Sequence, residues 1–175
     1  MNNQELWKEL HLKKRFRPKY PEGEVVRWLF KNIPQDEDKK VLDDGCGAGR
    51  HVMLLAENGY IPYGIDFSES GVDYTRQLLT NRGYTQYVEN VICGSCDSLP
   101  YENNFYDGLI SFGVLYYLDV AAIRQAVKEI YRVLKKMEKL SLLLEIQMII
   151  DMKALIRILR FQLQIISLVP VQKMV

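Results

Sequence analysis

Residues 41–50 read VLDDGCGAGR, and this stretch decides the fold. Residues 39–43 have the pattern of a short strand that ends in carboxylates, and residues 51–57 have the pattern of a helix that begins where the three glycines stop. A strand, a glycine-rich turn and a helix make the first half of a βαβ unit. Glycine is needed in such a turn because the backbone turns tightly and a ligand must lie close against it.

The spacing of the glycines distinguishes between two kinds of ligand. A dinucleotide-binding turn requires G-x-G-x-x-G, and its third glycine would fall at Arg50. This chain has G-x-G-x-G instead, with Asp43 two residues upstream. The form D-x-G-x-G-x-G after an apolar strand closely resembles motif I of the class I S-adenosylmethionine-dependent methyltransferases. A glycine loop alone also fits a tight turn that binds nothing.

The composition predicts one globular domain. The chain has 175 residues, of which 48% are apolar and 26% are charged, and its net charge of +1 gives no general attraction to nucleic acid or membrane. Three cysteines argue against a disulfide framework and for a reducing cytoplasm. No apolar leader or membrane span is visible, so we expect a cytoplasmic protein. We divide the domain into a helical arm (1–36), a cofactor-binding core (37–136) and an atypical tail (137–175).

The arm carries a short basic run at residues 13–19. This run fits either an RNA-binding patch or, as we prefer, the solvated face of a helix over residues 1–20. Residues 22–33 then have helical spacing. The apolar positions that we expect to face the core there are Val25, Val26, Leu29, Phe30 and Ile33.

A second strand over residues 61–65 is followed by Asp66, 17 residues beyond Gly49. In a doubly wound fold this is the place of an acid that accepts hydrogen bonds from both ribose hydroxyls. Ser68 is a natural N-cap for a helix that runs to about residue 81.

A third strand over residues 87–94 and a fourth over residues 105–112 flank the segment SCDSLP. The resemblance implies that Asp97 holds the adenine amino group and that Phe112 and Gly113 flank the ring, and a carboxylate and apolar walls suit these roles. The implied cofactor-binding residues are Asp43, Gly45, Cys46, Gly47, Gly49, Asp66, Phe67, Asp97, Ser98, Phe112 and Gly113.

Cys93 and Cys96 form a C-x-x-C pair whose position argues against a redox or zinc-binding role. A redox pair belongs at a helix start, and a zinc site needs a second pair of ligands, which isolated His11 and His51 do not supply. We therefore expect packing cysteines and no metal.

The sequence offers only weak candidates for a catalytic residue. A helix is expected over residues 120–135 after the N-cap Asp119, with the stripe Ile123, Val127, Ile130, Tyr131 and Leu134 buried. The family commonly places a residue of the loop before this helix near the transferred methyl, which suggests Tyr117. His51 is a second weak candidate, and Tyr20 is a third because aromatic faces attract cations such as a sulfonium.

Together these features predict an α/β fold, a doubly wound, mostly parallel sheet with helices on both faces. The resemblance implies methyl transfer from S-adenosylmethionine, which becomes S-adenosylhomocysteine, to a small-molecule acceptor. Two alternatives stay open: an RNA methyltransferase, and a non-catalytic cofactor-binding or interaction protein. We expect neither a nucleic-acid nor a membrane partner.

Residues 137–175 differ from the rest of the chain. Every glycine and tyrosine precedes Met137, and residues 136–139 read KMEK where the family has Pro-Gly-Gly or a close variant. Residues 140–146 still fit a fifth strand. Either this is an unusual C-terminal part, or a shifted reading frame has replaced the family ending. In both cases we expect an incomplete sheet and self-association through residues 140–169.

Overall fold

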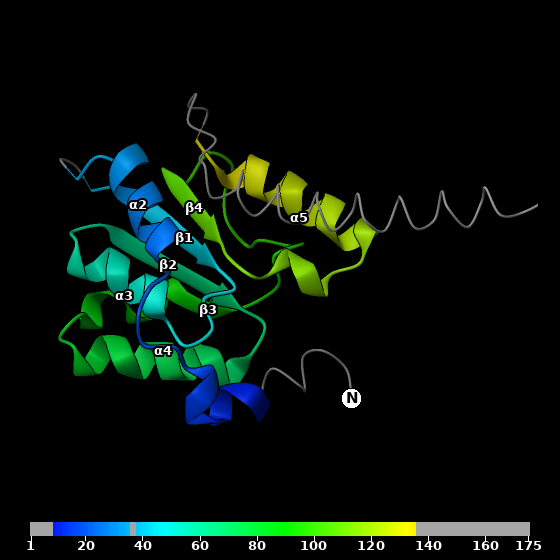
Figure 1. Cartoon of the computed structure of the whole chain (residues 1–175). Helices are drawn as coiled ribbons and strands as arrows, with labels where there is room; N and C mark the ends of the chain where they lie inside the picture. Colours follow the sequence, from blue (N-terminus) through cyan, green and yellow to red (C-terminus); the bar gives the residue numbers. More distant parts are fainter. Residues whose placement is uncertain (1–8, 36–37, 136–175) are drawn as a thin grey trace, which may run out of the picture.

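The computed structural model describes residues 9–35 and 38–135. Strands alternate with helices from α2 to β3, and β4 follows β3 without a helix between them (Figure 1). The elements are η1 (Lys14–Phe16), α2 (Gly23–Asn32), β1 (Lys40–Asp44), α3 (Arg50–Glu57), β2 (Ile61–Asp66), α4 (Glu69–Asn81), η2 (Thr85–Asn90), β3 (Val91–Cys93), β4 (Gly108–Ser111), η3 (Leu115–Tyr117) and α5 (Val120–Val133).

In the described residues the sheet has four parallel strands in the order β3-β2-β1-β4. The chain moves outward from β1 to β3 and then returns to place β4 on the other side of β1. The strand order therefore reverses at β1, where Asp44 pairs with Ile65 on one side and Ser111 on the other. A ligand of such a sheet binds at the carboxyl ends of the strands beside this reversal.

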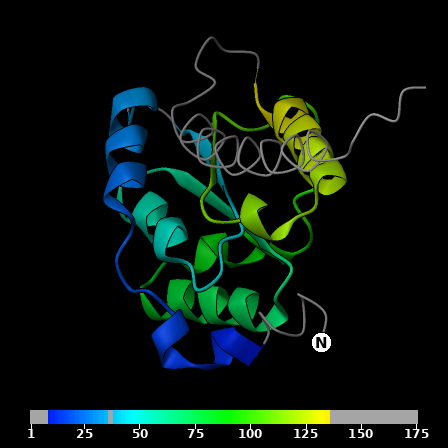
Figure 2. The ribbon, with the colours of Figure 1, turned by 45° about the vertical axis from the view of Figure 1, so that its right-hand side comes forward.

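Helices cover both faces of the sheet, as Figures 1 and 2 show together. Because strand side chains alternate, Val41 packs with α2 and α3 on one face, and Leu42 packs with α5 on the other. A further cluster joins α3 and α4 on the first of these faces. The predicted α/β, doubly wound fold is confirmed.

Two predicted strands were too long. The third begins at Val91, because residues 85–90 make a 3-10 turn in which the stacked rings of Tyr84 and Tyr87 pack on the α3–α4 cluster. The fourth begins at Gly108, because the N–H groups of Phe105 and Tyr106 both bind the carbonyl of Val133, the last residue of α5.

The helices begin where their caps predict. Ser68 Oγ accepts the N–H of Gly71 at 3.3 Å, and Asp119 Oδ1 accepts that of Ala122 at 2.8 Å. The predicted burial was wrong at Phe30 and Tyr131, which are 45% and 68% exposed. Their helices bury other residues instead, among them Trp28 on α2 and Ala126 and Val133 on α5.

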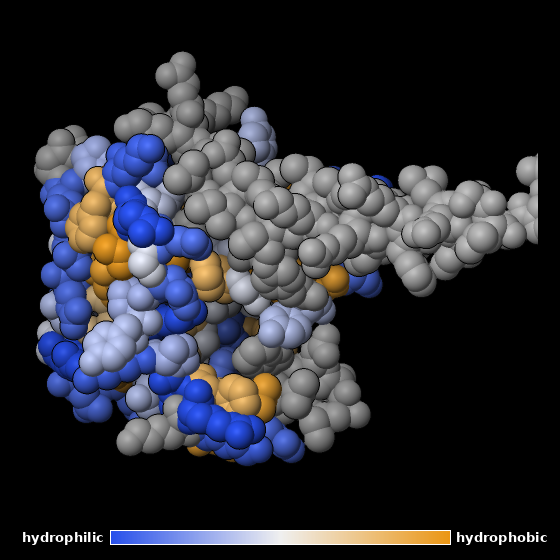
Figure 3. All heavy atoms as spheres, in the orientation of Figure 1, coloured by the Kyte–Doolittle hydropathy of each residue, from blue (hydrophilic) through white to orange (hydrophobic). Residues whose placement is uncertain are grey.

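The N-terminal arm is less helical than predicted. In its described part, residues 9–12 are helical and η1 follows, and the segment lies beside α4 in both views. Figure 3 shows apolar atoms at the surface over this arm, where Leu12 is 65% exposed.

The proposed fifth strand at residues 140–146 and the self-association through residues 140–169 lie outside the described residues. Within residues 9–35 and 38–135, the helices are too short or too polar to cross a membrane.

Candidate active site

The glycine loop between β1 and α3 is held in a left-handed backbone conformation. Gly45, Gly47 and Gly49 have φ angles of 74°, 51° and 79°. The Gly45 N–H donates to the Ile65 carbonyl of β2 at 2.8 Å, and Thr75 Oγ1 of α4 donates to the Gly47 carbonyl at 2.9 Å. The neighbouring strand and helix therefore fix the loop in a shape that favours glycine.

A cavity of about 870 Å³ lies at the carboxyl ends of the strands, bounded by this loop. Five segments line it: His11, Arg15, Phe16 and Pro18 of the arm; residues 44–48 and Arg50; residues 65–67 at the end of β2; residues 93–96 at the end of β3; and residues 112–114, 117 and 118. Its position is the one that the reversal of strand order at β1 predicts.

Asp66 connects the end of β2 to the glycine loop. Its Oδ2 accepts the N–H of Gly47 and its Oδ1 accepts the N–H of Ser68, both at 2.8 Å. Burial raises the pKa of Asp66, while these two bonds and nearby His11 lower it, and the net direction is upward. A carboxylate oxygen accepts more than one hydrogen bond, so Asp66 keeps acceptor capacity toward the cavity that it lines.

His11 is a site residue that the sequence analysis missed. Its Nδ1 lies 2.9 Å from Ser68 Oγ, and its ring fills the space above Gly47 and Gly71. A Cβ added to Gly71 would lie 2.8 Å from Nδ1. Burial lowers the pKa of His11, and Asp66 opposes this shift. A glycine inside the helix expected after Ser68 was the one available signal, since it marks close approach by another segment.

Asp43 and Asp44 are adjacent in sequence but face opposite sides of the sheet. Asp43 Oδ1 lies 3.5 Å from His51 Nδ1, and His51 Nε2 accepts the N–H of Glu22. Both nitrogens of His51 are thus engaged, and neither Asp43 nor His51 lines the cavity. Together they connect β1, α3 and the start of α2.

Asp44 is the carboxylate of the pair that does line the cavity. It is 1% exposed, and its Oδ2 accepts a hydrogen bond from Ser111 Oγ at 3.0 Å. Burial raises the pKa of Asp44 to about 7; the carboxylates of Asp43, Asp66 and Asp97 add to the rise, and the Ser111 bond opposes it.

Asp44→Asn should therefore stabilise the folded protein more at pH 8 than at pH 5. The raised pKa means that the folded state binds this proton more tightly than the unfolded state, whose pKa is near 3.8. The free energy of unfolding then falls as pH rises from about 4 to 7, and the amide removes this loss, by up to a few kcal/mol. Urea unfolding at both pH values measures the difference. The exposed Asp73→Asn, which removes the same charge, is the control and should show no such gain.

The segment after β3 reaches the cavity with different residues from those expected. Ser95 and Cys96 line it, whereas Asp97 and Ser98 do not. The chain turns toward α5 after Cys96, because Leu99 is buried in the α5 core and its N–H binds Glu129 Oε2 at 2.9 Å.

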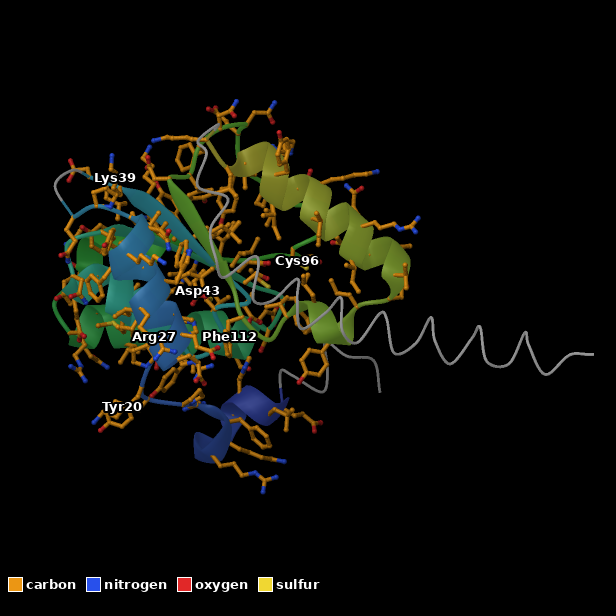
Figure 4. The ribbon with its side chains drawn as sticks, turned by 45° about the horizontal axis from the view of Figure 1, so that its top comes forward. Tyr20, Arg27, Lys39, Asp43, Cys96 and Phe112 are labelled. Atoms are coloured by element: carbon orange, nitrogen blue, oxygen red, sulfur yellow. The ribbon has the colours of Figure 1, made fainter. Side chains whose placement is uncertain are left out.

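Phe67, Phe112, Gly113 and Tyr117 line the cavity, so Tyr117 is the one catalytic candidate that borders it. Tyr20 is 73% exposed and lies in a second depression on the far side of Arg50. In Figure 4, Asp43 and Phe112 lie in the middle of the molecule and Tyr20 points outward.

The cysteines are not joined in disulfides. Burial raises the pKa of the Cys96 thiol to about 12, which makes it a poor nucleophile. In the described part of the chain no group of three or more His, Cys, Asp or Glu side chains is placed to hold a metal ion.

Cys93→Ser combined with Cys96→Ala should leave the affinity for S-adenosylmethionine within a few-fold, since neither thiol offers a strong hydrogen bond. Calorimetry with and without a reductant measures this. A zinc content that disappears in the variant, or an affinity that depends on the reductant, would contradict it.

Comparison with known proteins places the chain in a family. A model described as a methyltransferase domain matches residues 42–142, more than half of the chain. The protein YcgJ of Bacillus subtilis, named as an uncharacterized methyltransferase, is 28% identical over 120 residues, which are 67% of this chain and 45% of that one. Its crystal structure has a TM-score of 0.55 at 25% identity and covers 65% of this chain and 47% of that chain.

Two relatives carry the names of specific reactions. A demethylmenaquinone methyltransferase of Symbiobacterium thermophilum is 28% identical over 120 residues, 65% of this chain and 46% of that protein. A 24-methylenesterol C-methyltransferase of Arabidopsis thaliana is 31% identical over 98 residues, 55% of this chain and 26% of that protein.

The chain spans less than half the length of these relatives. S-adenosylmethionine is the cofactor that belongs with this family, as the resemblance implied. The matched domain, the parallel sheet and the glycine loop agree, and the chain belongs to the methyltransferase domain family, in its class I, S-adenosylmethionine-dependent form.

Proposed function

We propose that this chain binds S-adenosylmethionine in the 870 Å³ cavity and transfers its methyl group to a small, largely apolar acceptor. The observation that carries the proposal is the juxtaposition of the left-handed glycine loop, the buried Asp66 and aromatic walls around one cavity at the point where the strand order reverses. A glycine loop that bound nothing would not need a cavity of this size beside it.

Different residues around the cavity are assigned to different parts of the cofactor. Asp66 is suited to the ribose hydroxyls, because its oxygens keep acceptor capacity after binding Gly47 and Ser68. Phe67 and Phe112 offer apolar surfaces to the adenine ring. We assign the polar edge of that ring to Ser95 and the backbone of Cys96, in place of Asp97 and Ser98.

When bound, the cofactor supplies a methyl group on a positively charged sulfur, which becomes a neutral thioether on transfer. Holding the acceptor atom in line with this methyl group supplies a large share of the rate. An acceptor that is a neutral amine or an acidic hydroxyl then loses its proton to water, so a strong base is not required for it. Tyr117 borders the cavity, and we propose that it positions the acceptor.

The walls on the side of η3 and the arm support this choice of acceptor class. Apart from His11 and Arg15 of the arm, the residues that line this part of the cavity are apolar or aromatic: Phe16, Pro18, Val114, Tyr117 and Leu118. Such a surface suits a flat or aliphatic molecule better than a charged one. Two relatives are named for a sterol and for demethylmenaquinone, which are acceptors of this kind.

Calorimetry with S-adenosylmethionine and S-adenosylhomocysteine tests cofactor binding, and methyl transfer to a panel of quinols, sterols and small amines tests the reaction. Binding with turnover on apolar acceptors is the expected result. Binding without turnover would favour a non-catalytic protein, and affinity for RNA that falls steeply with salt would favour an RNA methyltransferase. No binding of either ligand would overturn the proposal.

A further inference from the structure

We propose that Asp44 is the anionic partner of the cofactor's sulfonium, so that the cavity holds the charged methyl donor more tightly than the demethylated product. This inference rests on the proposed function and assigns one residue within it. Asp44 is not an acid that motif I singles out, since the spacing of that motif names Asp43.

The two carboxylates that line the cavity differ in the hydrogen bonds that they accept. In the described residues, Asp44 and Asp66 are the acidic side chains that line it. Asp66 accepts two backbone N–H groups, one on each oxygen. Asp44 accepts one hydrogen bond, from Ser111 Oγ to Oδ2, so its Oδ1 is left to interact with whatever fills the cavity. Asp44 is 1% exposed, so this interaction is little weakened by bulk water.

The surroundings of Asp44 favour a positive ligand. The titratable groups that shift its pKa are carboxylates: Asp43 on β1, Asp66 at the end of β2 and Asp97 after β3. The other polar groups that interact with Asp44 in the described residues are neutral: the Ser111 hydroxyl on β4, and the thiols of Cys46 and Cys96 and the phenol of Tyr101, whose pKa values burial raises. The cations on the cavity wall, Arg15 and Arg50, belong to the arm and to α3, and Arg50 is already paired with Glu22 at 2.8 Å.

The charge of the ligand then couples to the proton on Asp44. With no ligand the raised pKa leaves the carboxyl partly protonated at neutral pH. A positive charge nearby favours the ionised form, so binding the donor should expel a proton. Donor and product both carry the amino-acid ammonium group, but the donor alone carries the sulfonium. The difference between the two ligands therefore isolates the sulfonium.

Calorimetry between pH 5.5 and 8.5 tests this coupling. We expect the affinity for S-adenosylmethionine relative to S-adenosylhomocysteine to rise by about three- to tenfold over this range, with a midpoint near pH 7. Repeating the titration at pH 7 in buffers of different ionisation enthalpy should show that the donor releases more protons than the product.

Three variants localise the effect. Asp44→Asn should remove both the pH dependence of the ratio and the extra proton release while both ligands still bind. Ser111→Ala, which removes the bond that stabilises the carboxylate, should move the midpoint to higher pH. Asp97→Asn changes a carboxylate that does not line the cavity. It should move the midpoint to slightly lower pH and leave the size of the change in the affinity ratio unaltered.

The outcomes separate this inference from the proposed function. If neither ligand binds, the function itself is wrong. If both bind with a ratio that does not change with pH, or if Asp44→Asn keeps the pH dependence, the assignment of Asp44 is wrong and the function stands. If the ratio is constant because both affinities rise equally with pH, Asp44 lies beside the ammonium group and is not the partner of the sulfonium.

Discussion

Gly47→Val should abolish binding of S-adenosylmethionine, with a loss of more than about a hundredfold in affinity, while the protein still unfolds cooperatively. The φ angle of 51° is strained for any side chain and worst for a β-branched one. A Cβ at this position would also lie 3.3 Å from Nε2 of His11, on the wall of the cavity. The substitution therefore disturbs the loop and the arm at the place where the ligand approaches. Calorimetry and thermal unfolding measure the two effects separately.

The chain offers a matched control for backbone strain. Gly59 has a φ angle of 81°, and a Cβ there would meet nothing within 4 Å. Gly59→Val should cost stability for the same reason as Gly47→Val and leave binding unchanged. If Gly47→Val loses its thermal transition while Gly59→Val keeps it, Gly47 serves the fold, and the case for a ligand beside it fails.

Asp66→Ala should weaken binding of S-adenosylmethionine by about 1–3 kcal/mol, or roughly five- to 150-fold. The variant loses the acceptors proposed for the ribose hydroxyls and also the bond that holds the N–H of Gly47. Asp66→Asn keeps one acceptor oxygen, so its affinity should lie between that of the wild-type protein and that of Asp66→Ala. To separate loop support from direct contact, adenosine and methionine can be titrated singly. Affinity for adenosine that is unchanged in both variants would contradict the ribose assignment.

The order of the elements was predictable because its signals are local. The glycine loop, the cap at Ser68 and the cap at Asp119 each lie within a few residues of the helix that they start. The lengths of β3 and β4 were not predictable in this way. They depend on where residues 85–90 turn and on the bonds from Phe105 and Tyr106 to Val133, far along the chain.

The site residues likewise divide into those that local spacing predicts and those that depend on contacts between distant parts of the chain. The loop and Asp66 belong to one βαβ unit, so spacing alone places them together. His11 reaches Ser68 across 57 residues, and although Gly71 signals that another segment approaches there, no local pattern identifies that segment as His11. The choice between Asp43 and Asp44 depends on which side of the pleat faces the cavity, so a shift of one residue changes which carboxylate meets the ligand. The turn after Cys96 similarly carries Asp97 and Ser98 away from the cavity that Ser95 borders.

The arm that supplies one wall of the cavity bears on how quickly ligands exchange. His11, Arg15, Phe16 and Pro18 line the cavity, yet they precede the first strand and reach the rest of the domain through side chains such as His11 on Ser68 and Arg17 over the ring of Tyr74. A ligand that leaves past the arm would have to loosen these contacts, whereas its affinity also depends on the loop and on Asp66. Residence time and equilibrium affinity are therefore set by partly different residues. A donor and a product that bind with different affinities would still share one exit rate if the arm, and not the ligand, is the slower to move.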